Sequence, residues 1–170
     1  MADTKYLDTL VDSIRAIYRE EKDYFSPMQG CEQAVQFRIA HRMADQIEHQ
    51  TKDIKVDCEA RKCNGYIKVD KKRPDIIIHK RKSTDYLVVE IKCNKRNWNN
   101  DFDKLVRFTH KNKPNLSGDN VPTYELGAFV YLADNEQDKA IRIYENGKDV
   151  TNEYPYNKFL EDFKYAEIRR

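Results

Sequence analysis

Two short aliphatic runs in this chain are each interrupted by a single carboxylate. Asp75 comes directly before Ile76-Ile77-Ile78, and Glu90 lies between Val88-Val89 and Ile91. Runs of this composition are typical of central β-strands. An unpaired charge in such a strand is costly, because burial removes it from water. Any fold of this chain must therefore supply both carboxylates with a partner.

The pairing of the two strands decides whether the carboxylates meet. Side chains alternate between the two faces of a strand, so Glu90 and Lys92 share a face. If the strands form a hairpin with Lys80 opposite Asp85, then Asp75 lies directly across from Glu90. A slip of one residue would send the two carboxylates to opposite faces. The expected site therefore depends on this register.

Two carboxylates with Cβ atoms about 5 Å apart repel each other unless a cation lies between them. Oxygen ligands, few protein groups and several waters fit Mg²⁺ or Mn²⁺ better than zinc. Lys92 cannot be a ligand while charged, but its ammonium could orient an attacking water or offset charge on a phosphorane-like transition state. This chemistry is that of phosphodiester hydrolysis. The alternative is a structural salt bridge, for instance of Glu90 with Lys92 or Arg73.

Hydrophobic periodicity and turn residues predict an α/β fold. The chain is short for two domains, so we expect one domain that spans residues 1–170. Its middle part is expected to form a mixed sheet with helices on its faces. We expect helices at about 4–25, 31–50, 101–111 and 157–168, and strands at about 54–61, 74–80, 86–92, 124–132 and 141–144. The last strand should belong to a short edge hairpin with its turn at Asn146-Gly147.

Four segments resemble those of the PD-(D/E)xK nuclease superfamily, the fold of many restriction endonucleases, Holliday-junction resolvases and phage exonucleases. The resemblance covers roughly Cys31 to Leu132. The segments are Val56-Asp57-Cys58-Glu59, residues 73–81 (Arg-Pro-Asp-Ile-Ile-Ile-His-Lys-Arg), Val89-Glu90-Ile91-Lys92 and Asp103-Lys104-Leu105.

This resemblance implies a restriction-endonuclease-like αβββαβ core, with extra helices at the N-terminal and C-terminal ends. It implies that Asp75 and Glu90 bind Mg²⁺ or Mn²⁺ together with the backbone carbonyl of Ile91. Lys92 would be the catalytic lysine, and DNA would be the substrate. Homodimers are common among such enzymes, although nothing in the sequence identifies a self-complementary patch or a protein partner.

Such nucleases frequently add a glutamate from the helix before the first strand, and Glu32 matches it. With about 100° per residue, Glu32 lies about 20° from Ile39 and about 60° from Val35 on the helical wheel, so it points along the apolar stripe. It could therefore complete the metal shell. The alternative is that an acid in the first helical turn complements the helix macrodipole.

Basic residues are concentrated in the middle of the chain. Residues 61–113 hold 16 Lys and Arg against 6 Asp and Glu, whereas the rest holds 15 against 23. A positive region of this kind suits a polyanion, although a solvated lysine-rich surface would look the same. Trp98 could stack on a base or pack on the core. The candidates for DNA contact are Arg73, Lys80, Arg81, Lys95, Arg96 and Trp98.

The apolar runs, the N-terminal residues and the cysteines bear on where the protein is found and on whether it binds zinc. No apolar run approaches the roughly 20 residues of a membrane span, and the first residues lack a signal-peptide pattern, so we expect a soluble cytoplasmic protein. The spacing of the four cysteines argues against a zinc site. His79 is expected to bond a neighbour within the sheet. The alternative to a nuclease is a catalytically silent nuclease-like module that binds nucleic acid or a protein through its basic segment.

Overall fold

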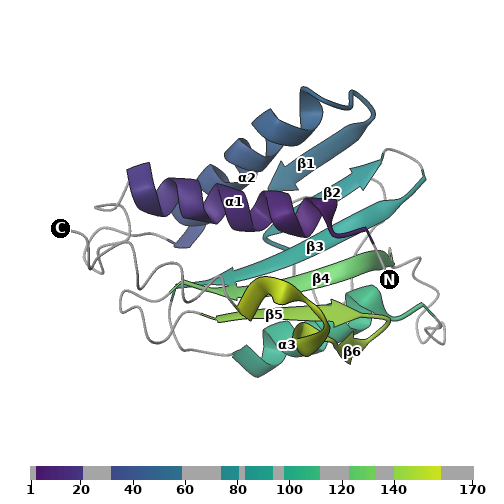
Figure 1. Cartoon of the computed structure of the whole chain (residues 1–170). Helices are drawn as coiled ribbons and strands as arrows, with labels where there is room; N and C mark the ends of the chain where they lie inside the picture. Colours follow the sequence, from purple (N-terminus) through teal and green to yellow (C-terminus); the bar gives the residue numbers. More distant parts are fainter. Residues whose placement is uncertain are drawn as a thin grey trace.

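The computed structural model describes residues 3–20, 32–58, 74–80, 83–93, 98–111, 123–132 and 140–157. Within these ranges the chain forms three α-helices and one open six-stranded mixed sheet, which is an α/β architecture (Figure 1). The strands are β1 (Ile54–Cys58), β2 (Ile76–Lys80), β3 (Asp85–Lys92), β4 (Tyr124–Tyr131), β5 (Ala140–Glu145) and β6 (Lys148–Asp149).

The order of strands in the sheet follows the order of the chain. All neighbouring strands are antiparallel except β3 and β4, which are parallel. A parallel pair needs a crossover connection, and the helix α3 (Trp98–Thr109) lies within it. This crossover places α3 beside β3, the strand that carries Glu90 and Lys92. Two short 3₁₀ turns follow β6, at Thr151–Glu153 and Pro155–Asn157.

Helices cover both faces of the sheet. The helices α1 (Lys5–Glu20) and α2 (Glu32–Glu48) lie on one face and α3 lies on the other, as Figure 1 shows. Each face buries its own apolar cluster, because strand side chains alternate between faces. On the α1 and α2 side the strands contribute Ile76, Ile78, Leu87, Val89, Ile91, Leu126, Ala128 and Val130. On the α3 side they contribute Ile77, Val88, Tyr124, Phe129, Tyr131 and Tyr144.

The register between β2 and β3 agrees with the prediction at the start of β2, where Asp75 lies. Ile76 pairs with Val89, so the next position along brings Asp75 opposite Glu90. The premise used for this prediction is wrong, however, because His79 rather than Lys80 pairs with Asp85. An irregularity between Ile78 and His79 absorbs the difference. The one-residue offset therefore stays at the turn end of the hairpin.

Most predicted elements are confirmed where the structure describes them. The turn predicted between β5 and β6 is also confirmed, since Asn146 has φ 50° and Gly147 φ 75°. Positive φ at both central residues is what a two-residue hairpin of this type requires. Residues 158–168 of the helix predicted at 157–168 lie outside the described residues, and its first residue, Asn157, ends a 3₁₀ turn. The ends of three other predicted elements, at 21–25, 31 and 59–61, also lie outside them.

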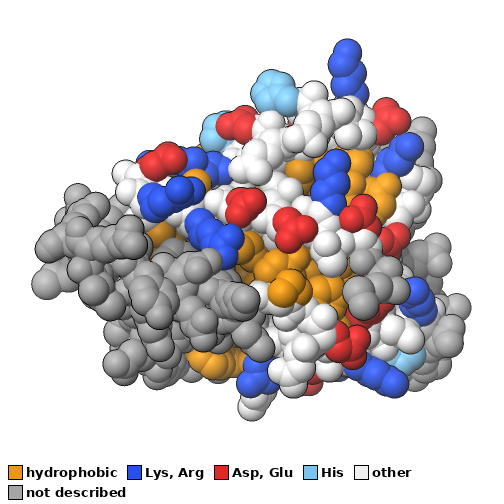
Figure 2. Space-filling view, viewed as in Figure 1, with side chains coloured by type: hydrophobic (Ala, Val, Ile, Leu, Met, Phe, Trp, Pro, Cys, Tyr) orange, Lys and Arg blue, Asp and Glu red, His pale blue; other side chains and the backbone are white. Residues whose placement is uncertain are grey.

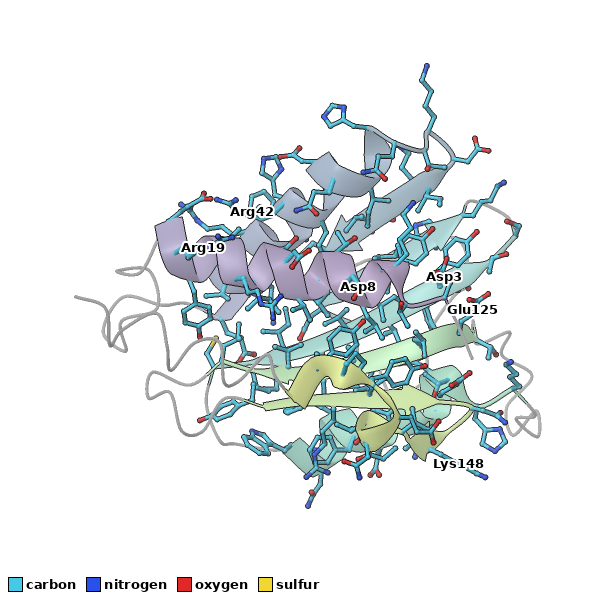
Figure 3. The ribbon with its side chains drawn as sticks, in the orientation of Figure 1. Asp3, Asp8, Arg19, Arg42, Glu125 and Lys148 are labelled. Carbon is cyan, nitrogen blue, oxygen red and sulfur yellow. The ribbon has the colours of Figure 1, made fainter. Side chains whose placement is uncertain are left out.

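Polar contacts fasten the helices to one another and to the C-terminal turns. Arg42 of α2 forms an ion pair with Glu20 at the end of α1. Asp8 lies on the side of α1 next to the yellow C-terminal turns (Figure 3), and its Oδ1 accepts a hydrogen bond of 2.9 Å from the Tyr156 hydroxyl. The first contact ties α1 to α2, and the second ties α1 to the chain that follows β6.

The described part of the face seen in Figure 2 carries both acidic and basic side chains, interspersed around apolar patches. This face therefore presents no single-sign surface in the part of the chain that is described. No helix among the described residues is long and apolar enough to cross a membrane.

Candidate functional site

Asp75 stands at the start of β2, beside the end of β3. Its backbone N–H donates to the carbonyl oxygen of Val89 at 3.2 Å. Its Oδ2 accepts a hydrogen bond of 2.6 Å from the backbone N–H of Ile91. The pairing of the two strands thus holds the Asp75 carboxylate against the acidic segment of β3.

Glu90 is fully buried, at 0% exposure, on the face that α3 covers. Its Oε2 accepts a hydrogen bond of 2.8 Å from Nζ of Lys104 on α3. Its Oε1 is buried and has no hydrogen-bond partner. Because an unpartnered charged oxygen is costly in such an environment, this atom marks a place where a cation or a proton is needed.

Lys104 also pairs with a second acid on its own helix. Its Nζ lies 2.8 Å from Oδ1 of Asp101, one helical turn earlier. Asp101 is 4% exposed, and its Oδ2 is buried without a hydrogen-bond partner. That oxygen lies 3.7 Å from Nζ of Lys92. Asp101 therefore lies between the two lysines of the site.

Glu32 reaches the site from the first turn of α2. Its Oε1 accepts a hydrogen bond of 3.0 Å from Nζ of Lys92, and its Oε2 accepts one of 3.0 Å from the backbone N–H of Cys93. Lys92 is thereby held at the end of β3 between a helix from each face of the sheet. Glu32 lies in the first turn of α2, as the macrodipole interpretation requires, and its side chain contacts Lys92. Its place in a metal shell stays a prediction.

These six side chains, which we call the charge cluster, come from four different elements of the fold. The cluster consists of Glu32, Asp75, Glu90, Lys92, Asp101 and Lys104. Four carboxylates face two ammonium groups, so the charge cluster has a formal charge of −2 when every group is ionised. One divalent cation would bring that charge to zero.

Burial raises the pKa values of both central carboxyls. Desolvation raises the pKa of Asp75 to about 6, against the lowering effect of the hydrogen bond from Ile91 and of the neighbouring lysines. Desolvation followed by the charge of Asp75 raises the pKa of Glu90 to about 8, although Lys104 opposes the shift. The protein alone therefore does not fully stabilise two ionised carboxylates at this point.

Both lysines keep their charge. Burial disfavours the ammonium form of Lys92, yet the hydrogen bond to Glu32 and the surrounding carboxylates outweigh it and raise its pKa above the ordinary 10.5. The pKa of Lys104 is raised in the same way, because Glu90 and Asp101 outweigh its desolvation. Each lysine therefore acts as a fixed positive charge near pH 7 rather than as a proton acceptor.

A hard divalent cation fits the donor set between Asp75 and Glu90. In the part of the chain that is described, no three His, Cys, Asp or Glu side chains are grouped so as to hold a metal ion by themselves. Mg²⁺ does not need such a group, because it keeps several waters and is commonly bound through one or two carboxylates. The buried and unpartnered Oε1 of Glu90 supplies a ligand atom of the kind that Mg²⁺ prefers.

The residues predicted to contact DNA are only partly described. Lys80 is exposed on β2 and forms an ion pair of 3.5 Å with Asp53. Trp98 begins α3 and packs its ring against Tyr131 and Phe129, at centroid distances of 4.6 and 5.5 Å. This arrangement agrees with the core-packing interpretation of Trp98. Arg73, Arg81, Lys95 and Arg96 lie outside the described residues.

Two other expectations concern side chains away from the charge cluster. His79 is joined to Asp57 at 2.8 Å between Nε2 and Oδ2, which confirms that it bonds a neighbour within the sheet. Cys58 and Cys93 form no disulfide within the described residues, and they pack against the apolar cluster under α1 and α2. Cys31 and Cys63 lie outside the described residues.

Asp101 and Lys104 were not predicted as site residues, although a signal for them exists in the sequence. Asp101 lies four residues before Leu105, and Lys104 lies four residues before Phe108. Both therefore point along the apolar stripe of α3. A charged residue on such a stripe needs a reason, and the same observation singled out Glu32.

Neither the models of known protein families nor the curated proteins contain a match to this chain.

Proposed function

We propose that this chain is a metal-dependent nuclease of the PD-(D/E)xK type, which hydrolyses phosphodiester bonds of DNA. The observation that carries the proposal is the fully buried Glu90, whose unpartnered oxygen lies in a cluster with Asp75 and Lys92. A purely structural salt bridge would leave no excess of buried carboxylates, since each acid would have its own cation. The excess here matches the charge of one divalent ion.

A Mg²⁺ or Mn²⁺ ion would be held by Asp75, Glu90 and the backbone carbonyl of Ile91. When bound, the ion supplies Lewis-acid stabilisation to the phosphate oxygens. The chain itself contributes preorganisation, because the Ile91 N–H fixes one oxygen of Asp75 at 2.6 Å and the sheet fixes Glu90. Ligands that are already oriented need no reorganisation as charge develops.

Lys92 would act on the reacting phosphate. Its ammonium is held by Glu32 at 3.0 Å and by Asp101 at 3.7 Å, and 19% of its side chain is exposed. A lysine fixed in this way can donate hydrogen bonds to an attacking water and offset negative charge on the transition state. Since its pKa is raised, it acts through its charge and not as a general base.

The element order supports the finer fold assignment. The helix α2 is followed by β1, β2 and β3, then by α3 and β4, which is the αβββαβ order of a restriction-endonuclease-like core. Three acids of the charge cluster lie where the resemblance expects them, with Asp75 directly before β2, Glu90 on β3 and Glu32 at the start of the helix before β1. The helix α1 would then be the expected N-terminal addition to this core.

The test is cleavage of plasmid, linear duplex and single-stranded DNA with Mg²⁺ or Mn²⁺ by the native chain and by Lys92→Ala. Loss of one fixed transition-state charge should lower the rate by about 10² to 10³. Lys148→Ala, which removes an exposed lysine of β6, is the matched control and should keep most of the activity. Equal cleavage by native and Lys92→Ala protein would contradict the proposal. DNA binding without cleavage would favour the catalytically silent module.

A further inference from the structure

Lys104 bridges two buried acids. Its Nζ lies 2.8 Å from Oε2 of Glu90 and 2.8 Å from Oδ1 of Asp101. The three side chains are 17%, 0% and 6% exposed, respectively. In this position the ammonium supplies positive charge to both acids, as a second metal ion would in a site with two metals.

We infer that Lys104 is a built-in second cation, which restricts the nuclease site to a single divalent ion. This inference rests on the proposed function and deepens it. It assigns to Lys104 a role in selecting the number of metal ions, separate from the role of Lys92 at the phosphate.

Counting charges supports the inference. With Lys104 present, the charge cluster has a formal charge of −2, which one divalent ion neutralises. Without Lys104 the formal charge would be −3, and one divalent ion would leave Glu90 and Asp101 short of a counter-ion. Because this pair is almost fully buried, water cannot make up the difference. A second divalent ion would then be attracted to the position that Lys104 now fills.

Asp101 has a clear place in this scheme. Its Oδ1 is bound by Lys104, and its Oδ2 has no hydrogen-bond partner. A second ion that replaced Lys104 would need Asp101 as a ligand, whereas the first ion would need only Asp75 and Glu90. Neutralising Asp101 should therefore remove the second position without removing the first.

The experiment counts Mn²⁺ ions bound per chain by isothermal titration calorimetry and by electron paramagnetic resonance. We expect one ion in the native protein, two in Lys104→Met, and one again in the double variant Asp101→Asn/Lys104→Met. Two neighbouring Mn²⁺ ions would also give an exchange-coupled spectrum, which a single ion cannot give. Lys111→Met, which removes an exposed lysine just after α3, should bind one ion like the native chain.

Binding of two ions by the native protein would overturn the inference, whatever the variants do. One ion in Lys104→Met would also overturn it, provided that circular dichroism shows the variant folded. Should Lys104→Met fail to fold, Lys104→Gln takes its place, since an amide can still donate to one of the two acids. No Mn²⁺ binding by any of these proteins would overturn the proposed function as well, whereas one ion throughout would overturn the second-cation role alone.

Discussion

Replacement of Glu90 by glutamine should change how stability depends on pH. The pKa of Glu90 lies at 4.5 for an ordinary glutamate and is raised to about 8 in the folded chain. Between these two values the unfolded chain has lost the proton and the folded chain keeps it. Because the folded state binds more protons there, the free energy of unfolding falls as pH rises, by up to about 1.4 kcal/mol per pH unit.

The burial of Glu90 sets the size of this effect. The side chain is fully buried, so solvent does not screen the penalty, and the loss between pH 5 and pH 9 should be on the order of 4 kcal/mol. A glutamine has no proton to lose in this range. The stability difference between Glu90→Gln and the native chain should therefore shift in favour of the variant as pH rises.

Urea denaturation of the metal-free proteins at several pH values between 5 and 9 measures this difference. Asp103→Asn removes an exposed carboxyl of α3 and should give a curve parallel to that of the native chain. Saturating Mg²⁺ should flatten the native curve, because an ion that binds the folded state stabilises it. Parallel curves for native protein and Glu90→Gln would refute the reasoning that Glu90 is buried without sufficient counter-charge.

Three further predictions concern single contacts. Glu32→Gln should lower kcat of DNA cleavage about tenfold, since Glu32 positions Lys92. KM and the affinity for Mn²⁺ should stay unchanged. Loss of Mn²⁺ binding in calorimetry would instead make Glu32 a ligand. Trp98→Ala should lower the free energy of unfolding in urea by about 2 to 3 kcal/mol, because the ring packs on Phe129 and Tyr131. Unchanged stability with weaker binding of single-stranded DNA would place the indole on a base. Gly147→Ala should destabilise by about 1 to 2 kcal/mol in the same assay, since φ is +75° and a Cβ would lie 2.8 Å from Cδ2 of His110; an unchanged urea midpoint would contradict this.

The sequence predicts the central strands well, because runs rich in β-branched residues and bounded by turn residues indicate β2 and β3. Alternation along a strand is enough to put Glu90 and Lys92 on one face. The predicted position of Asp75 across from Glu90 agrees with the hydrogen bond that Asp75 accepts from the N–H of Ile91. Glu32 is predicted from the family resemblance together with helical periodicity, which places it along the apolar stripe of its helix.

Other parts of the site could not be predicted for physical reasons. The predicted pairing of Lys80 with Asp85 is wrong, because the strands change register between Ile78 and His79. No pattern in the sequence marks such an irregularity. The contact between Lys104 and Glu90 joins a helix to a strand 14 residues earlier, and periodicity gives the face of a helix but not what lies opposite. From the sequence, Trp98 could either stack on a base or pack on the core, and only the tertiary structure distinguishes these two interpretations.

The irregularity between Ile78 and His79 has a consequence for how this protein can change. The change of register occurs between Ile78 and His79, next to the turn. The pairing of Ile76, Ile77 and Ile78 with β3 is regular. A residue gained or lost at the tip during evolution would be absorbed there and would not invert the faces of the strands at their other end. The tip is therefore a suitable place to insert a reporter peptide without disturbing the acidic residues.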